Sequence, residues 1–519
     1  MKKVLSVLLV LVMVLGLFSA CNKKPTPTDV PGGDGTPKKG GIIHVYTDME
    51  PKSLDAFRTR LMVTMPAYEG ILIKKDDGTF KCNLIKEYSA DLKNLTYTLT
   101  LKDEPVYFHD DSIMTAEVLA WNINQYKEVG YFASSFNMID KAEAVDDKHV
   151  VIKMKEWDLL IPYDLSRMCY PVSKEFVEKN GWDALNEQEC GTGAFKLKNW
   201  VHGDRVEFEK FTKYHEGEPR VDEVHVVVYS SVETALLALQ KGEIEIMSVG
   251  GQPKKKLEEL QNQYGCVLNI GESSGAVLTL GYMCNNPDDP LYDKNVRKAL
   301  SHAIDCNAIG QALTDGYFVK DIHQWGLPTY AYCSPNVKGF EYDPELAKKM
   351  LAEAGYPNGF KTTLKGGTAS QDRAVMIKSY LAEIGVEVEL EITDRANFDQ
   401  YVSGWPSGLL LHQAGTANGQ EYQLSNSARS DVTTGFGSGS FIHNEELDKL
   451  CRQCLGSEAK DSYAPMQRVA EIMFQEECCM LPLYMSIGMI MQQGYLKEAH
   501  IYDGVVTEGY TWHLMWLDK

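Results

Sequence analysis

A serine between two glycines is the first feature of the sequence whose residue types could carry out covalent chemistry. Residues 271–275 read GESSG and fit the G-x-S-x-G pattern, in which a sharp strand-to-helix turn exposes a nucleophilic serine. The residues before the motif, 266–270, predict a strand. The residues after it, 276–283, are apolar and β-branched without helical spacing, so they predict a second strand. We therefore interpret the motif as a turn between strands and expect no catalytic residue there.

Other patterns that would indicate an enzyme or a metal site are incomplete. HEGEP at 215–219 lacks the second histidine of H-E-x-x-H, and no spacing of His and Asp residues indicates a triad or a zinc site. Cys451 and Cys454 form a C-x-x-C pair, but with Leu447 and Leu455 they fall at i, i+4, i+7 and i+8 on one helix face. We expect these thiols to pack in a core, and we expect neither an enzyme nor a bound metal or cofactor.

The composition limits the partners and the number of lobes. A chain of 519 residues is too long for one ordinary core and predicts several lobes. It carries 72 acidic and 52 basic residues, a net charge of -20, which disfavours nucleic acid as a partner. Eleven of the twelve cysteines lie beyond position 21 at irregular spacings, so we interpret them mostly as small hydrophobic residues and not as a disulfide framework.

The N-terminus has the features of an export signal. A basic start is followed by an uncharged apolar run, Val4–Phe18, which is shorter than the ~20 residues that span a bilayer. We expect residues 1–20 to be a signal peptide. No second apolar run approaches the length of a membrane span, so we expect the rest of the chain to be soluble.

The small residues before Cys21 resemble the bacterial lipobox, in which the cysteine is acylated and becomes the new N-terminus. Phe18 stands where that motif usually has leucine. Residues 21–40 are rich in Pro, Gly, Thr and charge, which predicts a disordered tether. We expect lipidation of Cys21 and an extracytoplasmic protein anchored to the cell membrane; the alternative is an ordinary secretory signal followed by an incidental cysteine.

Helices and strands alternate along the rest of the chain. Ser230 and Glu233 form a capping box that predicts a helix ending at Gly242. The helical pattern AVMIKSYLAEI is followed by VEVELEI, which alternates with period two, and together they predict a βαβ unit and an α/β fold. More β-rich stretches at 96–102, 149–154 and 205–211 predict antiparallel ribbons.

Several segments, in one order along nearly the whole mature chain, resemble the extracytoplasmic solute-binding proteins of ABC importers, in the branch that takes oligopeptides, dipeptides and nickel complexes. The segments are GGIIHVYTDMEPKSLD (40–55), YEGIL (68–72), LTYTLTLKDEPVYFHDDSIMTAEVL (95–119), GTGAFKLKNWVHGDRVEFE (191–209), TALLALQKGEIEI (234–246), Asn285-x-x-x-x-Pro290-Leu291, DKNVRKALSHAID (293–305), YDPELAKKMLAEAGYPNGF (342–360) and MLPLY (480–484).

The resemblance implies an α/β fold of the type II periplasmic-binding-protein kind, with three lobes and a ligand cleft between lobes one and three. The expected boundaries are 41–72, 190–280 and 484–519 for lobe one, 73–189 for lobe two and 281–483 for lobe three. It also implies a monomer that delivers a small-molecule or peptide ligand to importer permeases, and lobes that close over the ligand by a hinge motion.

The family's specificity loop matches residues 398–423, which supply the candidates for the lobe-three wall, and three residues of lobe one are expected to face them. The expected ligand-binding residues are Arg58, Thr59, Arg60, Phe398, Tyr401, Trp405, His412, Gln413, Thr416 and Asn418. Core packing is the alternative for each aromatic residue. For His412, the alternatives are a metal-chelate contact and a hydrogen-bonded structural role.

The resemblance leaves the ligand class open. Thr416 stands where the peptide binders place an acidic residue that pairs with an ammonium, so we predict that a salt bridge to a free N-terminus is not the main contact. Glu421 is the alternative partner if the loop is shifted. A peptide, an oligosaccharide and a metal chelate remain possible ligands, and a membrane-tethered sensor that has kept the fold is the competing function.

Overall fold

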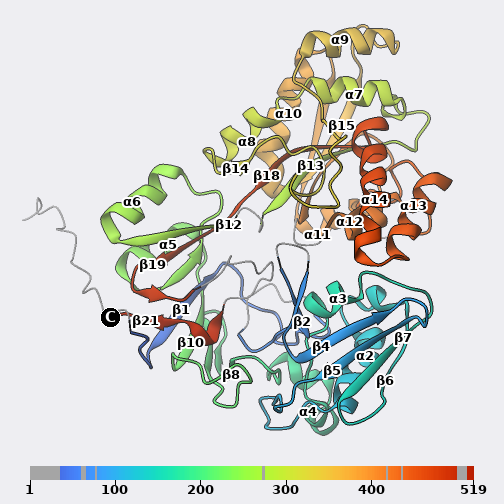
Figure 1. Cartoon of the computed structure of the whole chain (residues 1–519). Coiled ribbons are helices and arrows are strands. Elements are labelled where there is room, and N and C mark those ends of the chain that lie inside the picture. Colours follow the sequence, from blue (N-terminus) through green and yellow to red (C-terminus); the bar gives the residue numbers. More distant parts are fainter. Residues whose placement is uncertain are drawn as a thin grey trace, which may run out of the picture.

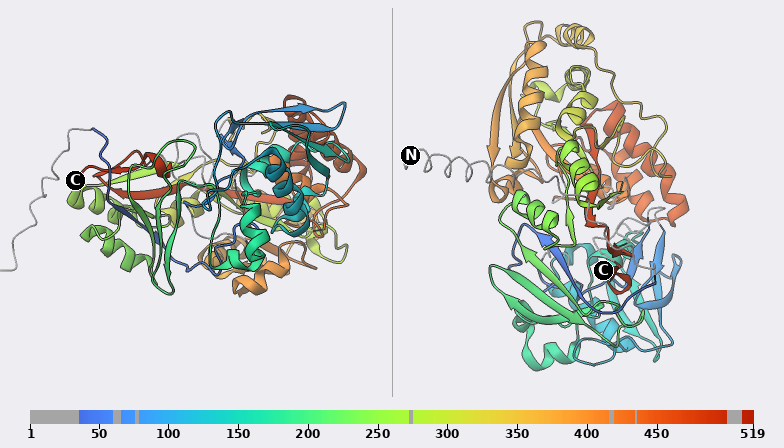
Figure 2. Two further views of the ribbon diagram at one scale, coloured as in Figure 1. Left: turned by 90° about the horizontal axis from the view of Figure 1, so that it is seen from below. Right: turned by 90° about the vertical axis from the view of Figure 1, so that its left-hand side faces the viewer.

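The structure is a computed structural model, and it describes residues 36–59, 66–75, 79–271, 275–415, 419–433, 436–499 and 511–519. Three lobes, each with its own sheet, make up the molecule (Figure 1). In the right-hand view of Figure 2, lobe three forms the upper half, and lobes one and two form the lower half. The predicted α/β class is confirmed.

Lobe one is built on a mixed sheet that collects strands from separate parts of the sequence. Among the described residues its strand order is β12-β19-β11-β1-β10-β9-β8, with β1 parallel to both β10 and β11. Helices α5 and α6 bury their apolar faces against residues of this lobe. The elements are β1 (Ile42–Thr47), β8 (Phe195–Val201), β9 (Arg205–Lys210), β10 (Glu223–Val228), α5 (Val232–Lys241), β11 (Ile246–Ser248), α6 (Lys254–Tyr264), β12 (Cys266–Gly271) and β19 (Gly488–Gln493), with β20 (Leu496–Lys497), η9 (Trp512–Leu514) and β21 (Trp516–Leu517) near the end of the chain.

Helix α5 follows the signals that its sequence carries. Its N-cap is Ser231, one residue later than the predicted Ser230, and the Ser231 hydroxyl accepts the Thr234 amide at 3.2 Å. Gly242 ends the helix at φ 72°, a left-handed conformation that glycine adopts without strain. The predicted helix and its end are confirmed.

Lobe two surrounds a four-stranded antiparallel sheet with the order β4-β5-β7-β6. The ribbons predicted at 96–102 and 149–154 are strands β5 and β7, which pair with each other. The elements are β2 (Leu72–Lys74), β3 (Phe80–Cys82), β4 (Ile85–Asp91), β5 (Thr96–Leu101), α2 (Ala116–Val129), η1 (Ala133–Phe136), β6 (Ile139–Ala144), β7 (His149–Met154), α3 (Ile161–Arg167), α4 (Lys174–Asn180) and η2 (Trp182–Asn186).

Lobe three contains the predicted βαβ unit, because β15 and β16 pair in parallel and α10 connects them. Its sheet has the order β14-β18-β13-β17-β15-β16. The elements are β13 (Ala276–Tyr282), η4 (Pro290–Tyr292), α7 (Lys294–His302), α8 (Cys306–Thr314), β14 (Phe318–Val319), α9 (Pro344–Glu353), β15 (Lys361–Gly367), η5 (Thr368–Ser370), α10 (Gln371–Glu383), β16 (Glu387–Thr393), α11 (Arg395–Phe398), η6 (Asp399–Tyr401), β17 (Leu409–Gly415), α12 (Gly419–Ala428), α13 (Glu445–Leu455), α14 (Ala459–Ala470), η8 (Glu471–Glu476, a π-helix) and β18 (Met480–Ser486).

Two chain crossings connect lobe one to lobe three, and the sheets place them a few residues from the expected boundaries. Strand β13 belongs to the lobe-three sheet, so the first crossing lies between Gly271 and Ala276 and not at 280. Strand β18 also belongs to lobe three, so the second crossing lies at Ile487 and not at 483. Strands β13 and β18 are apolar and buried, and they pair with each other. Local sequence patterns do not reveal this pairing, because the two strands lie far apart in the sequence.

The second glycine of GESSG lies at the first crossing. A Cβ on Gly275 would lie 1.5 Å from the carbonyl oxygen of Ser486, so the two crossings approach too closely for a side chain. The element that follows is strand β13 and not the helix of a nucleophile turn, whereas residues 272–274 lie outside the described part of the chain.

The cysteines lie mostly in the lobe cores. Cys451 and Cys454 are fully buried on α13, as predicted, and no disulfide joins cysteines within the described residues. Burial raises the pKa of Cys451 to about 12, which keeps its thiol protonated and unreactive at neutral pH. No helix in the described part of the chain combines the length and the apolar character that crossing a bilayer requires.

A buried ion pair joins lobe two to the segment that leads back into lobe one. The Nδ1 atom of His109 lies 2.7 Å from a Glu189 carboxylate oxygen, and its Nε2 atom lies 2.9 Å from the carbonyl oxygen of Gly193. Both ring nitrogens face acceptors, so the ring satisfies them fully only as an imidazolium. Burial alone would lower the pKa of His109, but the Glu189 carboxylate raises it above the usual value.

We predict that this pair makes stability pH-dependent above about pH 6.5, the ordinary pKa of histidine in an unfolded chain. Because the folded-state pKa of His109 is raised, the stabilisation is complete below that pH and is lost as pH rises through the folded-state pKa. His109→Gln should lower the free energy of unfolding by about 3–5 kcal/mol at pH 6 and remove this part of the pH dependence. Chemical denaturation across the pH range measures both effects.

The control variant is His149→Gln. His149 pairs with Asp146 at 2.8 Å, but both side chains are exposed, so the loss should stay below about 1 kcal/mol. If His109→Gln and His149→Gln lower the free energy of unfolding equally, the buried pair does not stabilise the protein more than the exposed pair does.

Candidate functional site

The strand directions define two sheet edges that face each other across the crossings. In lobe one, β1, β10, β11 and β12 all end at the edge from which the chain leaves for lobe three. In lobe three, β15, β16, β17 and β18 end at the edge where β13 begins. The two edges lie close together because the crossings are short (Figure 1). In open α/β sheets, ligands bind outside the carboxyl ends of the strands, so these two edges define the candidate site.

Arg373 provides positive charge at the lobe-three edge. It lies in the first turn of α10, the helix that follows β15. Its Nη1 atom is 3.4 Å from the Ser370 hydroxyl, and its guanidinium carbon lies 5.8 Å from the ring centre of Tyr484. The Nε atom is buried and has no hydrogen-bond partner among the residues that the structure describes. A buried N–H without a partner is costly, so Arg373 has unused capacity to bind an anion.

Sequence reasoning did not select Arg373. The signal that would have indicated it is a basic residue in the first turn of a helix, where the helix dipole disfavours a cation. The residue also follows a strand that ends in two glycines, Gly366 and Gly367.

Two carboxylates lie at the lobe-one edge near the end of β1. Asp48 directly follows β1, and Glu233 lies in the first turn of α5. Burial raises the pKa of Tyr46, and the nearby Asp48 and Glu233 carboxylates raise it further. The rings of Tyr46 and Tyr229 lie 6.3 Å apart at the same edge. The lobe-one edge therefore places two carboxylates beside Tyr46, and the three lysines that begin α6 also lie at this edge, after β11.

Two predicted wall aromatics lie near the end of β16. Phe398 is almost buried, at 9% exposure, whereas Tyr401 is half-buried. The Lys365 ammonium lies 5.1 Å from the Tyr401 ring centre and pairs with Glu391. One face of the Tyr401 ring is therefore occupied by a cation, and the ligand-binding role of both aromatics stays a prediction.

Trp405 lies in the core of lobe three. It is 3% exposed, and its indole N–H donates to the carbonyl of Gly408 at 3.0 Å. Its ring stacks on Phe436 and meets the edge of Phe441, with ring centres 5.9 and 5.8 Å apart. Core packing, the alternative stated for each aromatic, therefore describes Trp405 in this structure.

His412 and Gln413 are neighbours on β17 and point to opposite faces of the sheet. His412 is half-buried and stacks on Phe436 with ring centres 4.0 Å apart and an interplanar angle of 17°. Gln413 is exposed. Within the described residues no group of three or more His, Cys, Asp or Glu side chains is arranged to hold a metal ion.

Arg58 and Thr59, two of the lobe-one candidates, make hydrogen bonds near the junction with lobe two. The Arg58 guanidinium donates to Asp55 at 2.6 Å, to Asp183 at 3.1 Å and to the carbonyl of Trp182 at 2.9 Å. The Thr59 hydroxyl donates to the carbonyl of Asp55. These contacts occupy three of the five guanidinium N–H groups and the Thr59 hydroxyl, and the ligand-binding role of both residues stays a prediction.

Three further candidates cannot be placed. Arg60, Thr416 and Asn418 lie outside the described residues, and so does the side chain of Glu421. The predicted absence of an amine-binding acidic residue in this loop stays a prediction.

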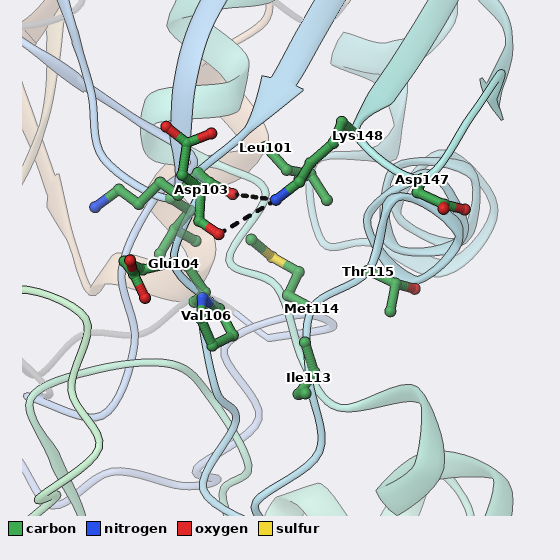
Figure 3. A pocket seen from close by; sticks show the side chains of 12 residues that line it. Leu101, Asp103, Glu104, Val106, Ile113, Met114, Thr115, Asp147 and Lys148 are labelled. Atoms are coloured by element: carbon green, nitrogen blue, oxygen red, sulfur yellow. Dashed lines mark hydrogen bonds between the residues drawn. The ribbon is translucent and has the colours of Figure 1, made fainter.

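A separate small cavity lies within lobe two, away from the two edges. Its volume is about 170 Å³, and its lining includes Leu101, Ile113 and Met114. Figure 3 shows Lys148 at its rim, where the ammonium donates to the carbonyls of Lys102 and Asp103. The cavity is formed by lobe two alone, so it is not part of the candidate site.

The fold is that of the periplasmic binding proteins. A solved structure of the DppA protein from Helicobacter pylori in complex with the peptide STSA aligns with a TM-score of 0.76 at 20% identity, covering 93% of this chain and 99% of that one. The NikA protein from Brucella suis in complex with Fe(III)-EDTA aligns with a TM-score of 0.81 at 18% identity, covering 92% and 100%. At these identities the likeness shows the fold alone.

The family follows from the sequence comparison. The model of the bacterial extracellular solute-binding proteins, family 5 Middle, matches residues 79–435, and the chain belongs to this family. The oligopeptide-binding protein AppA of Bacillus subtilis (strain 168) is 26% identical over 488 residues, covering 83% of this chain and 87% of AppA. The glutathione-binding protein GsiB of Pectobacterium atrosepticum is 28% identical over 384 residues, covering 70% and 71%. The expected family is confirmed.

We predict that Trp405→Ala destabilises the protein by about 3–5 kcal/mol, because it removes a buried indole and leaves a cavity. Chemical denaturation measures the loss. The control variant Trp200→Ala removes a half-buried indole from lobe one and should cost less. An unchanged free energy of unfolding together with weakened ligand binding would instead place Trp405 in the binding wall.

Proposed function

We propose that this protein is the lipid-anchored binding protein of an ABC importer and that it captures a short peptide or a similar oligomeric solute that carries a carboxylate. The observation that carries the proposal is the Nε–H of Arg373 at the lobe-three edge, which finds no partner within the described part of the chain. A carboxylate matches the planar guanidinium geometry and accepts two parallel hydrogen bonds from it.

The first turn of α10 adds to the attraction for an anion. The N-cap residue, Ser370, makes no side-chain cap, and the Gln371 amide already donates to the Thr368 carbonyl, so it is the helix dipole that favours an anion here. A ligand carboxylate near Arg373 would accept hydrogen bonds from the side chain and would also be attracted by the helix dipole.

The two carboxylates near the end of β1 suit the other end of a peptide. A free ammonium near Asp48 and Glu233 would lie opposite the carboxylate bound by Arg373, so the two edges together match a zwitterion. Relatives named as oligopeptide- and glutathione-binding proteins support the same ligand class.

We predict that Arg373→Gln weakens the binding of short free peptides by about ten- to a hundred-fold, since a hydrogen-bonded charged contact is worth about 1.5–3 kcal/mol. Isothermal titration calorimetry with peptides of two to five residues measures the change. C-amidated versions of the same peptides should bind wild type weakly and lose little more in the variant.

Lys378→Gln is the matched control, because Lys378 is an exposed cation on the same helix. Its peptide affinity should equal that of wild type. If free and C-amidated peptides bind equally well, or a neutral oligosaccharide binds more tightly than any peptide, the proposed ligand class is wrong.

The lipid anchor of the proposal depends on Cys21. Several acyl chains contribute about 0.8 kcal/mol per buried methylene, which is enough to hold a protein on a membrane. We predict that Cys21→Ala moves the protein from the membrane fraction of expressing cells to the soluble fraction or the medium. Fractionation with immunoblotting measures this, and a variant that stays as firmly membrane-bound as wild type would contradict lipidation.

A further inference from the structure

Lobe two contacts lobe three through the end of helix α13. The Leu159 amide donates to the carbonyl of Leu455 at 2.9 Å, and the Trp157 indole N–H donates to the carbonyl of Ser457 at 2.9 Å. Leu455 is the last residue of α13, where helix carbonyls lack partners within the helix. Lobe two therefore supplies donors that the end of this helix needs.

The lobe-two segment is held in position before it meets lobe three. The Trp157 ring stacks on Tyr97, with ring centres 4.6 Å apart. The Tyr97 hydroxyl donates to the carbonyl of Asp158 at 3.0 Å, and the Asp158 carboxylate accepts the Leu160 amide at 2.9 Å. Since these bonds lie within lobe two, little conformational freedom is lost when the segment binds α13.

A second contact lies on the lobe-one side of lobe three. The carboxylate of Asp315, at the end of α8, accepts the backbone amide of Lys254 at 2.9 Å. Lys254 is the first residue of α6, whose N-cap position is Pro253 and has no side-chain cap. A lobe-three carboxylate therefore caps a lobe-one helix, where the dipole favours negative charge. Tyr317, two residues further on, packs against the lobe-one core.

We propose that these two contacts form a latch that holds lobe three against lobes one and two without any ligand. Every donor and acceptor in the latch belongs to the protein, and the two contacts join lobe three to different lobes. Both contacts therefore stabilise the same position of lobe three relative to lobes one and two. A solute that binds between the edges then adds its contacts to an equilibrium that already favours the closed state.

The lobe-two contact is also linked to a proton. Burial raises the pKa of Asp158 to about 6, against the opposing effects of a backbone N–H and of Arg429 from lobe three. Arg429 also binds the Asp431 carboxylate. Asp164 on α3 is a second carboxyl group near Asp158 and is fully buried. The Tyr97 hydroxyl donates to the Asp158 carbonyl and not to its carboxylate. If the lobes separate, Asp158 becomes more exposed and its pKa falls toward about 3.9. The latched state therefore binds the proton more tightly, and the latch strengthens as pH falls through about 6.

Amide hydrogen exchange tests the latch, because the Leu159 amide is protected by a carbonyl of another lobe. The experiment uses mature protein freed of bound solutes by unfolding and refolding. Asp315→Gly removes the α6 cap at a left-handed position, φ 52°, that glycine tolerates. This variant should raise the exchange rate of Leu159, on the other side of lobe three, several-fold. Asp315→Asn keeps an acceptor oxygen and should stay close to wild type.

The reverse experiment uses Trp157→Phe, which removes the indole donor and keeps a ring over Tyr97. It should raise the exchange rate of the Lys254 amide, whereas Trp121→Phe, which alters a lobe-two indole stacked on Trp182, should not. Changes confined to the mutated contact would overturn the proposal, since two independent local contacts are not a latch.

The proton linkage has its own readout. The protection of Leu159, corrected for the intrinsic pH dependence of exchange, should fall as pH rises from 5 to 7 in wild type and stay flat in Asp158→Asn. If wild type and Asp158→Asn show the same pH dependence of Leu159 protection, Asp158 does not link the latch to a proton. Low Leu159 protection at every pH in solute-free wild type, restored only by a peptide, would show that the ligand alone closes the lobes.

Discussion

The antiparallel pairing of the two crossing segments is the constraint on which the rest of the structure depends. Strand β12 pairs with β19 in lobe one, and β13 pairs with β18 in lobe three, so both crossings leave one sheet and enter the next side by side. The approach is so close that Gly275 has no room for a Cβ beside Ser486. This pairing sets which strand ends face each other and limits lobe three to motions about two short segments.

The charges of the site follow from that arrangement. Arg373 reaches the edge because α10 begins where β15 ends, and Asp48 reaches the opposite edge because β1 ends there. Neither residue is close to the other in sequence. The same crossings place Asp315 beside α6, and lobe two contacts α13 on the other side of lobe three. Ligand contacts and latch contacts therefore both stabilise the arrangement in which lobe three lies against the other two lobes.

The sequence predicted what local patterns determine. The period of VEVELEI, the end of α5 at Gly242 and the buried stripe of Cys451 and Cys454 depend on residues a few positions apart, and the structure confirms them. The order of family-like segments also gave the family and the α/β class. Side-chain environments formed by distant segments were harder to predict.

The candidate site shows this limit. Arg58 pairs with Asp183, 125 residues away, and the backbone of Trp405 exchanges hydrogen bonds with the Ser440 hydroxyl. Local sequence patterns do not reveal either contact, and the ligand-binding role of both residues stays a prediction. The sequence did not locate the crossings to the residue because β13 and β18 are apolar strands whose pairing joins residues about 200 positions apart. Arg373 was missed because the environment of its N–H, which has no partner among the described residues, forms only when α10 packs near Tyr484.

The central claim is that a solute is held between the lobe-one and lobe-three edges. The most direct measurement compares hydrogen exchange in the protein as purified with its natural solute and in the protein stripped of that solute, with native mass spectrometry to confirm occupancy. The account predicts added protection both in the first turn of α10 and in residues 48–50, with little change around the lobe-two cavity lined by Met114. Protection confined to that cavity, or absent from both edges while the solute is bound, would contradict it.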